Sequence, residues 1–496
     1  MRSLAIVTLA ASAVSADIHI AEHSGGPICT KKYNHDATVV ECSGVEWKPS
    51  SEAKIEKNCH EKDEAKHTLH FMNSKRSVSM APSHMSKREP ILIRDPPACN
   101  IPTRTSIIGD GTVDQGTSTA WRQCSTSQVS SPAADAIRDY LITSNVQMGA
   151  SYGVGKLSAS KVDKGYEAGA RFINAFPDEI VYGASATQLL RNVALGLSFE
   201  QGDEIIVSTL DHEANIAPWL DLADRQRLRI RWWCPEGQGN NPKLTVDSLK
   251  PLLSEKTRFL AFSHCTNLLG SIHDVKAIAA AAHEYRDVLV CVDGVAYAPH
   301  RSVDVKDLGV DLYCLSWYKV FGPHIAMLYG SREAQKQLQP LGHYFSPTAT
   351  LSDKAGFAAW SYELIASIPV VVDDLLAQGW KECVQQETEI QTLLLNYLNQ
   401  RSDVTVYGET SPDPSKRLPI ISFTIDGWNS RSVVAAIEAN SNLGLKHDHF
   451  YSHRLVTEVL DLDATDGVVR VSMAHYNTRE EIETVIATLQ EIIVKR

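Results

Sequence analysis

Short apolar runs alternate with amphipathic stretches between about residue 130 and residue 345. Five of the runs read EIIVST, RIRWW, RFLAFS, VLVCVD and LYCLS, and helix-like stretches such as PAADAIRDYL and DVKAIAAAAHEY precede or separate them. Continuous apolar runs of this length indicate strands buried on both faces, whereas apolar residues spaced by three and four indicate helices. The alternation predicts an α/β domain over 126–345, with a mostly parallel sheet covered by helices on both faces.

The pattern changes after residue 345. A long helical region is followed by the strands VTVY and IISFTI, a helix at 431–439, the strand VVRVS and a final amphipathic helix. This order of elements predicts a smaller α+β domain over 346–496.

The first quarter of the chain lacks such periodicity. The stretch MRSLAIVTLAASAVSA combines an early Arg2, an apolar run and a small-residue ending, which predicts a secretory signal peptide over 1–16. Residues 17–125 contain polar, turn-rich stretches such as KPSSEAKIEKNCHEKDEAKH, which favour an irregular or disordered region.

The ten cysteines divide into two groups that indicate different compartments. The first group could form disulfides in an oxidising compartment, and the second lies in apolar stretches typical of buried reduced thiols. The first group is Cys29, Cys42, Cys59, Cys99 and Cys124, and the second is Cys234, Cys265, Cys291, Cys314 and Cys383. The sequence therefore leaves secretion and a cytoplasmic location both open.

Composition narrows the class of function. With 43% hydrophobic and 22% charged residues, the 496-residue chain is an ordinary globular protein. A formal net charge of -11 without a long basic run argues against a nucleic-acid partner, and no segment beyond the leader is suited to cross a membrane. We expect chemistry on a small molecule.

Polar residues follow four of the predicted strands where each strand ends. His212 follows EIIVST, Asn267 follows RFLAFS, and Asp293 ends VLVCVD. Ser316 and Lys319 follow LYCLS. Because ligands bind at the carboxyl ends of strands in an open parallel sheet, we expect these side chains to form a site at one edge.

Asp293 and Lys319 are the most informative pair. An aspartate after a strand commonly caps a helix, and a lysine in a stretch such as LYCLSWYKVFGPH can bury only its stem. Together they are the two groups that pyridoxal phosphate needs, a carboxylate for its pyridine nitrogen and a desolvated amine that forms a Schiff base with its aldehyde. The turn in GASATQ, with Thr187 opening a helix, supplies a helix N-terminus for the phosphate, although such turns more often cap core helices.

Six motifs occur in the order found in one family: GASATQ, STLDHEANIAPW, SHCTNLLGSIH, VDGVAYAPHRSVDV, SWYKVFGPH and VRVSMAHYNTREE. Over about residues 125–496 the chain resembles class V aminotransferases of the cysteine desulfurase-like group, and within it decarboxylative aldolases of fungal secondary metabolism. The resemblance implies the type I fold of pyridoxal-phosphate-dependent transferases, an amino acid substrate and a homodimer.

The resemblance also implies residue roles. Lys319 would carry the cofactor and move protons, His212 would stack on its ring and shuttle protons, and Asp293 would pair with its nitrogen. Arg470 would bind the substrate carboxylate, a task suited to a planar guanidinium. The other implied cofactor contacts are Ala186, Thr187, Asn267, Ser316 and Tyr318, of which Asn267 would also contact the substrate.

The chain departs from true desulfurases, which carry a mobile cysteine in the loop before the final arginine strand. Here the loop reads LGLKHDHFYSHRL and contains no cysteine, and persulfide transfer needs a thiolate. Ala296 stands where relatives have a glutamine or a histidine that bonds the ring oxygen of the cofactor. Ala358 and Ala359 stand where a neighbouring subunit usually offers a Gly-Thr pair to the phosphate.

The expected function is therefore a pyridoxal-phosphate-dependent transferase or lyase acting on an amino acid, with carbon–carbon bond formation through an enamine suggested by the resemblance. Cysteine desulfuration, β-elimination from cysteine by a lyase, transamination and epimerisation remain open, and a secreted inactive binding protein is the alternative of another class. His447 and His449 lack a clear third ligand, so no metal is expected. Cys265 is predicted to be a packed thiol and His300 a structural hydrogen-bonding residue.

Overall fold

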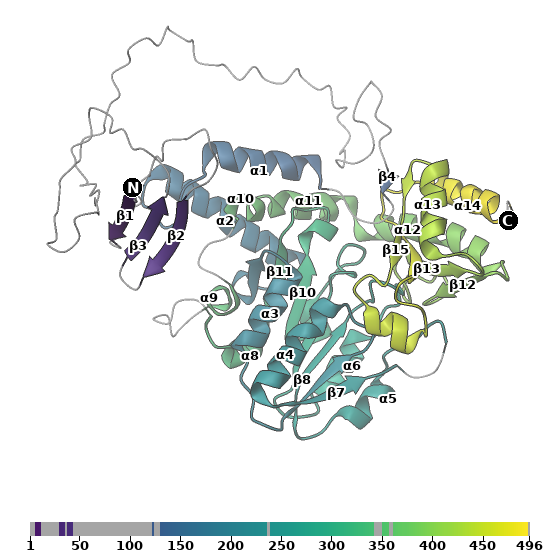
Figure 1. Cartoon of the computed structure of the whole chain (residues 1–496), viewed down its shortest axis with the longest axis horizontal. Coiled ribbons are helices and arrows are strands. Elements are labelled where there is room, and N and C mark those ends of the chain that lie inside the picture. Colours follow the sequence, from purple (N-terminus) through teal and green to yellow (C-terminus); the bar gives the residue numbers. More distant parts are fainter. Residues whose placement is uncertain are drawn as a thin grey trace, which may run out of the picture. The chain divides into compact units, whose positions relative to one another are not determined.

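The structure is a computed structural model that describes residues 129–235, 239–341, 350–356 and 361–494, together with four short strands before them. The chain divides into two units, Met1–Asn100 and Ile101–Arg496, and each is described by itself. In the first unit β1 (Ala5–Ala10), β2 (Cys29–Asn34) and β3 (Ala37–Cys42) form an antiparallel sheet in the order β1-β3-β2 (Figure 1). Apart from these strands and β4 (Arg122–Gln123), the predicted signal peptide and region 17–125 lie outside the described residues.

The second unit is built around a seven-stranded sheet with the order β5-β11-β10-β9-β8-β6-β7. All five predicted strands are confirmed and run parallel to one another, namely β6 (Glu204–Ser208), β7 (Arg229–Trp233), β8 (Thr257–Ser263), β9 (Leu289–Asp293) and β10 (Leu312–Ser316). The pattern did not predict β5 (Ile180–Gly183) or β11 (Ala326–Gly330). Strand β11 pairs antiparallel with both of its neighbours, so the sheet is mostly parallel, as expected.

Helices cover both faces of this sheet because successive strand residues point to opposite sides. In β8, Leu260 and Phe262 pack into one apolar cluster, and Phe259 and Ala261 pack into the other. Helices on the first side are α1 (Ser131–Thr143), α2 (Gly153–Phe172), α5 (Val246–Leu249), α6 (Val275–Ala282), α7 (Val305–Leu308), α10 (Tyr362–Ile365) and α11 (Ile368–Gln378). Helices on the second side are α3 (Ala186–Gly196), α4 (Ala217–Gln226), α8 (Arg332–Gln337) and α9 (Leu351–Ala355) (Figure 1).

The C-terminal part forms a second, smaller layer of sheet and helices. An antiparallel sheet of order β12-β13-β16-β15 contains β12 (Val404–Tyr407), β13 (Ile420–Ile425), β15 (Lys446–Asp448) and β16 (Val468–Ser472). It shares an apolar core with α12 (Trp380–Asn399), α13 (Ser430–Asn440) and α14 (Arg479–Val494). The short β14 (Leu443–Gly444) pairs with β4. Strands β12, β13 and β16 and helices α13 and α14 confirm the predicted α+β character.

The division between domains at residue 346 stays a prediction. Helices α10 and α11 contact α2 and contribute side chains such as Ile365 and Val372 to the core of the larger sheet. Helix α12 contributes Ile390 and Leu394 to the core of the smaller sheet. The turn at Gly379, between α11 and α12, is thus where the chain passes from one core to the other.

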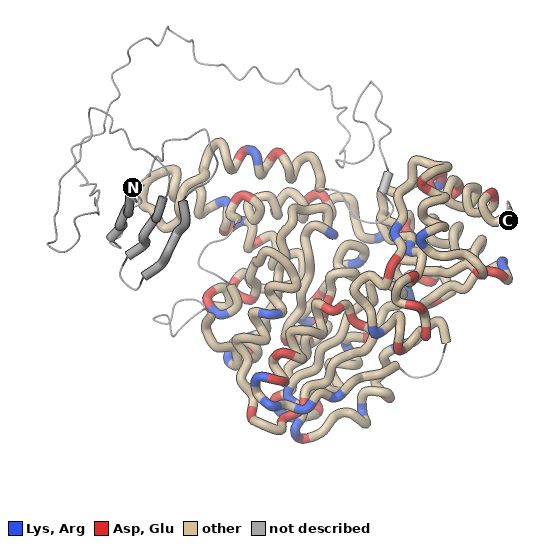
Figure 2. Tube along the Cα trace, viewed as in Figure 1, with Lys and Arg blue, Asp and Glu red and all other residues tan. Residues whose placement is uncertain are grey.

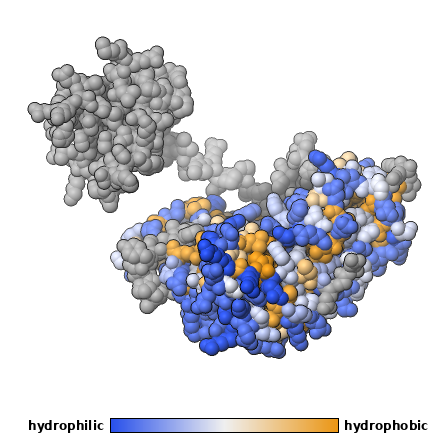
Figure 3. Space-filling view, turned by 60° about the horizontal axis from the view of Figure 1, so that its bottom comes forward, coloured by the Kyte–Doolittle hydropathy of each residue, from blue (hydrophilic) through white to orange (hydrophobic). Residues whose placement is uncertain are grey.

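The surface of the described residues is mixed in character. Lysine and arginine alternate with aspartate and glutamate along the trace (Figure 2), and one face is largely hydrophilic with smaller apolar groups between (Figure 3). Among the described residues, no helix combines the length and the apolar character that spanning a membrane requires.

Candidate active site

The sequence-predicted residues gather at the carboxyl edge of the larger sheet. His212 follows β6, Asp293 ends β9, and Ser316 ends β10, directly before the 3-10 turn Trp317–Lys319. Strands β9 and β10 are neighbours, β6 is separated from β9 only by β8, and all four run parallel, so their ends meet at one edge. Arg470 comes to the same place from β16 of the smaller sheet.

Lys319 has an amine whose basicity is lowered by its surroundings. Trp317 anchors the turn, because it is fully buried and its carbonyl accepts hydrogen bonds from the N–H groups of Val320 and Gly322 at 2.8 and 2.9 Å. Burial lowers the pKa of Lys319 to about 8, the cation of Arg470 adds to this, and the carboxylate of Asp293 opposes it. Near neutral pH an appreciable fraction of the amine is therefore an uncharged nucleophile.

Asp293 is a buried carboxylate placed to hold a positive charge. Its side chain accepts one hydrogen bond from the described residues, from Val295 N–H to Oδ1 at 2.8 Å. Burial raises the pKa of Asp293, while this bond and the cation of Lys319 lower it. Gly294 follows, and a Cβ there would lie 2.1 Å from the ring of Tyr313, so only glycine fits beside the carboxylate.

His212 is held as a neutral ring with a defined tautomer. Its Nδ1 accepts a hydrogen bond from Ala214 N–H at 2.9 Å, which leaves the proton on Nε2. Burial lowers the pKa of His212 to about 4, and the cations of Lys319 and Arg470 contribute. An uncharged imidazole of this kind suits stacking on an aromatic cofactor.

Asp211 is a site residue that the sequence reasoning missed. It is fully buried, accepts hydrogen bonds from Asn215 Nδ2 at 2.6 Å and Ser263 N–H at 3.1 Å, and is close enough to Asp293 to be affected by its charge. Burial raises the pKa of Asp211 to about 7, and Asp293 adds to the rise. Its position directly before His212, at a strand end, was the available signal.

Arg470 presents an unsatisfied donor. Its Nη1 donates to the carbonyl of Asn267 at 2.9 Å, its guanidinium lies 4.0 Å from the ring centroid of Phe450, and its buried Nε has no partner among the described residues. Burial lowers the pKa of Arg470 to about 10, which leaves it cationic at neutral pH. A carboxylate ligand matches this vacant donor.

Both polar atoms of the Asn267 side chain form hydrogen bonds with a neighbouring loop. Its Nδ2 donates to the carbonyl of Phe450 and its Oδ1 accepts from Ser452 Oγ, each at 2.9 Å. Asn267 lines the same cavity as Lys319 and Arg470, which agrees with its predicted contact with cofactor or substrate. That contact itself stays a prediction.

The predicted phosphate site lies at the start of α3. The helix begins at Ala186, one residue earlier than the sequence indicated, and its N-cap is Ser185, whose hydroxyl accepts from Gln188 N–H. The N–H groups of Ala186 and Thr187 precede the first residue that bonds within the helix and point outward for an anion. Thr187 is exposed and Ser316 is buried.

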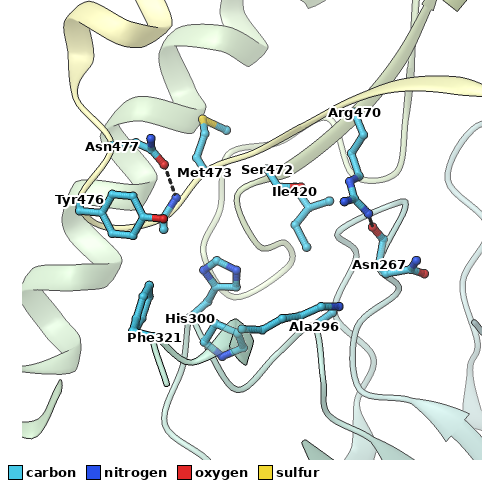
Figure 4. Close-up of a pocket in the computed structure, with 13 residues that line it drawn as sticks. Asn267, Ala296, His300, Phe321, Ile420, Arg470, Ser472, Met473, Tyr476 and Asn477 are labelled. Carbon is cyan, nitrogen blue, oxygen red and sulfur yellow. Dashed lines mark hydrogen bonds between the residues drawn. The ribbon is translucent and has the colours of Figure 1, made fainter. Parts of the chain in front are cut away.

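These residues fit pyridoxal phosphate. A buried carboxylate, a lysine with lowered pKa, a neutral histidine and a helix N-terminus occur at one sheet edge. Beside them is a cavity with Asn267 and Arg470 on one side and Phe321, Tyr476 and Asn477 on the other (Figure 4). No cysteine lines the described part of this cavity.

Other predicted residues have structural partners or lie elsewhere. The ring of Tyr318 stacks on His324 with centroids 5.1 Å apart, and His300 Nδ1 bonds Glu387 Oε1 at 2.7 Å. Within the described residues, no group of three or more histidine, cysteine or acidic side chains could hold a metal. Ala358 and Ala359 lie outside the described residues.

The later cysteines are free thiols, and four of them are buried as predicted. Burial raises the pKa of Cys265, which makes it an inert packed thiol. The prediction is wrong for Cys234, which is exposed because it follows β7, the edge strand of the sheet.

Comparison with known proteins gives a consistent family. The model of the family described as aminotransferase class-V matches residues 122–485. An aminotransferase-like protein, FGM3, of Gibberella zeae is 50% identical over 360 residues, covering 72% of this chain and 89% of that protein. A cysteine desulfurase-like protein, ustD, of Aspergillus flavus is 40% identical over 334 residues, covering 66% of this chain and 76% of that protein.

A solved structure shows the same fold. The apo structure of a cysteine desulfurase from Thermococcus onnurineus NA1 superposes with a TM-score of 0.68 at 23% identity, covering 75% of this chain and 94% of that chain.

Proposed function

The chain belongs to the aminotransferase class-V family and is a pyridoxal-phosphate-dependent enzyme, and from this premise we propose that it acts on an α-amino acid without transferring sulfur. We further propose carbon–carbon bond formation as its outcome. The observation that carries the proposal is that Lys319 and Arg470 line one cavity whose described lining contains no thiol, with the carboxylate of Asp293 close enough to Lys319 to affect its pKa.

The residues of the chain divide the work between binding and proton transfer. Pyridoxal phosphate, when bound, supplies a cationic ring that accepts the electron pair of a bond broken in the amino acid. Asp293 holds the positive charge of the ring nitrogen, and Arg470 holds the α-carboxylate through the donor that is otherwise vacant. Lys319, with a pKa near 8, can both take and return a proton at the α-carbon.

The lack of a cysteine in one loop and the burial of Cys265 support a reaction other than desulfuration. The loop over 443–455 contains no cysteine, and Cys265, the cysteine nearest in sequence to Asn267, is buried with a raised pKa. A persulfide needs an accessible thiolate, so we infer that sulfide is not the product.

A cofactor test separates this proposal from that of an inactive binding protein. Purified protein mixed with pyridoxal phosphate should develop the visible absorbance of lysine-bound cofactor, and Lys319→Ala should lose it. Lys336→Ala, which removes an exposed lysine on α8, should keep it. A colourless wild-type protein would support the binding protein instead.

A substrate screen tests the reaction class. Each amino acid is incubated with the loaded enzyme, with and without an added aldehyde, and alanine, sulfide, carbon dioxide, keto acids and new hydroxy amino acids are measured. We expect a hydroxy amino acid only when aldehyde is present. Sulfide from cysteine would contradict the inference drawn from the loop.

We also propose that the enzyme is a homodimer. Five apolar side chains at the end of α1 and the start of α2 are 42–66% exposed, which suits a surface covered by a second copy: Leu141, Ile142, Tyr152, Val154 and Leu157. Light scattering coupled to size exclusion should give twice the mass of the chain. A monomer at micromolar concentration would contradict the proposal.

A further inference from the structure

The loop between β15 and the following turn has an unusual backbone. Asp448, Phe450 and Tyr451 have φ angles of 148°, 51° and 60°, in a region that bulky residues rarely adopt. Such a conformation is strained and persists only where the surrounding structure enforces it. Contacts with neighbouring residues must therefore hold the backbone of residues 448–452, here called the aromatic loop, in this conformation.

The contacts that hold the aromatic loop come from the candidate active site. Asn267 binds the carbonyl of Phe450 and the hydroxyl of Ser452, each at 2.9 Å. The carbonyl of Tyr451 accepts from Glu213 N–H at 2.8 Å, next to His212. The ring of Phe450 lies 4.0 Å from the guanidinium of Arg470.

The loop backbone, the hydroxyl of Ser452 and the ring of Phe450 make these contacts. The side chain of Tyr451 takes no part in them. Its ring is 69% exposed and its centroid lies 5.2 Å from that of His212, with the planes tilted by 40°. Its hydroxyl has no hydrogen bond among the described residues. The strain therefore places an unused phenol beside the histidine expected to stack on the cofactor.

Resting on the proposed function, we infer that Tyr451 contacts the side chain of the amino acid substrate and determines specificity. A phenol combines an apolar face with a hydroxyl that donates a hydrogen bond. It favours a substrate side chain that carries a hydrogen-bond-accepting oxygen, such as a carboxylate or carbonyl. In the loop where desulfurases carry a reactive thiol, this chain thus carries a group that binds rather than attacks.

The test compares Tyr451→Phe and Tyr451→Ala with Tyr285→Phe, which changes a half-buried tyrosine just before β9, at the opposite edge of the larger sheet. For each variant, kcat/KM is measured for amino acids with oxygen-bearing side chains and for alanine. Tyr451→Phe should lower the ratio between the two classes about 10-fold, because the site loses one hydrogen bond. Tyr451→Ala should lower it further, and Tyr285→Phe should leave it unchanged.

A second readout is independent of turnover. Tetranitromethane modifies accessible tyrosines, and peptide mass analysis reports Tyr451 and Tyr285 separately in the wild-type holoenzyme. A preferred amino acid should protect Tyr451 at least several-fold and leave the modification of Tyr285 unchanged. Equal kcat/KM losses for all amino acids, or no protection of Tyr451, would overturn the inference while the proposed function stands. Amino acids that leave the cofactor absorbance unchanged would instead remove the proposed function, and this inference with it.

Discussion

The reactivity of Lys319 is controlled by burial and by the charges that face its amine. Burial and the cation of Arg470 lower the pKa of Lys319 to about 8, Asp293 raises it, and Lys446 has the smallest influence. The uncharged amine is the form that attacks an aldehyde. Its fraction increases as pH rises through the pKa, so attachment of pyridoxal phosphate should accelerate in the same range.

We predict that the attachment rate of pyridoxal phosphate to cofactor-free protein has a midpoint near pH 8. Arg470→Met removes the larger of the two cationic effects and should move the midpoint to higher pH, whereas Lys446→Met should move it less. Stopped-flow absorbance across a pH series measures both shifts. An unmoved midpoint in Arg470→Met would mean that burial alone sets the pKa.

Asp211 should make stability depend on pH in an unusual direction. Its pKa is raised from an ordinary value of 3.8 to about 7, so between these values the folded state binds more protons than the unfolded state. The free energy of unfolding then falls as pH rises through this window. With about 1.4 kcal/mol per pKa unit, the loss approaches about 4 kcal/mol.

We predict that Asp211→Asn removes much of this slope between pH 4 and pH 7, although it lowers stability at acid pH by breaking at least one of the buried hydrogen bonds that the carboxyl group accepts. Denaturant unfolding at several pH values measures the slope. Asp221→Asn, at a half-exposed position, is the control and should keep the wild-type slope. A wild-type protein whose stability increases over the window would contradict the assignment.

At the residue scale, the sequence located side chains that follow recognisable strands. His212, Asp293 and Lys319 were located in this way, and the structure brings them to one edge of the larger sheet, while their roles stay predictions. Phe450 and Tyr451 were not named as candidates, because positive φ angles and the contact of the Phe450 carbonyl with Asn267, about 180 residues away, are not visible in the sequence. The sequence showed that their loop lacks a cysteine and left open that the neighbouring His447, Asp448 and His449 line the substrate pocket.

At the scale of elements, a strand could be predicted only where its run of apolar residues was long enough to recognise. Strands β6, β8, β9 and β10 are largely apolar and almost wholly buried, because helices cover both faces. The edge strand β7 is only partly buried and contains Arg229 and Arg231. Strand β5 has four residues and β15 has three, too few to show a period. Strand β11 follows the turn after Lys319 and reverses direction, which local sequence does not reveal.

The turn after β9 requires glycine at position 294, because the backbone there lies very close to a side chain of β10. Gly294 faces Tyr313 of β10, a fully buried ring whose hydroxyl bonds His264 Nδ1 at 3.0 Å. We predict that Gly294→Ala lowers the melting temperature and weakens cofactor retention, since a Cβ 2.1 Å from this ring must displace it or Asp293. Calorimetry and the absorbance of dialysed holoenzyme measure the two effects.

Gly153 provides the matched control for this substitution. A Cβ at Gly153, in the first turn of α2, meets nothing within 4 Å. Gly153→Ala should be neutral or stabilise the protein by up to about 1 kcal/mol, because alanine favours helix. Similar melting temperatures for the two variants would show that the ring of Tyr313 yields easily.

At the scale of the whole second unit, the active site needs both sheets in a fixed relation. Lys319 and Asp293 belong to the larger sheet and Arg470 to the smaller one. A buried ionic group joins the two cores. Glu387 of α12 is fully buried, and its Oε1 and Oε2 bond His300 Nδ1 and Arg301 Nη1 at 2.7 and 2.8 Å, in the segment that follows β9.

We predict that Glu387→Ala lowers the free energy of unfolding by about 3–5 kcal/mol, because it leaves the buried guanidinium of Arg301 without its counter-charge. Glu389→Ala, at an exposed position on the same helix, should cost less than about 1 kcal/mol. Because the link holds Arg470 in register with Lys319, Glu387→Ala should also raise the KM for the amino acid more than it lowers the cofactor absorbance. If both variants unfold alike and bind substrate alike, the ionic group is not what keeps the two halves of the site together.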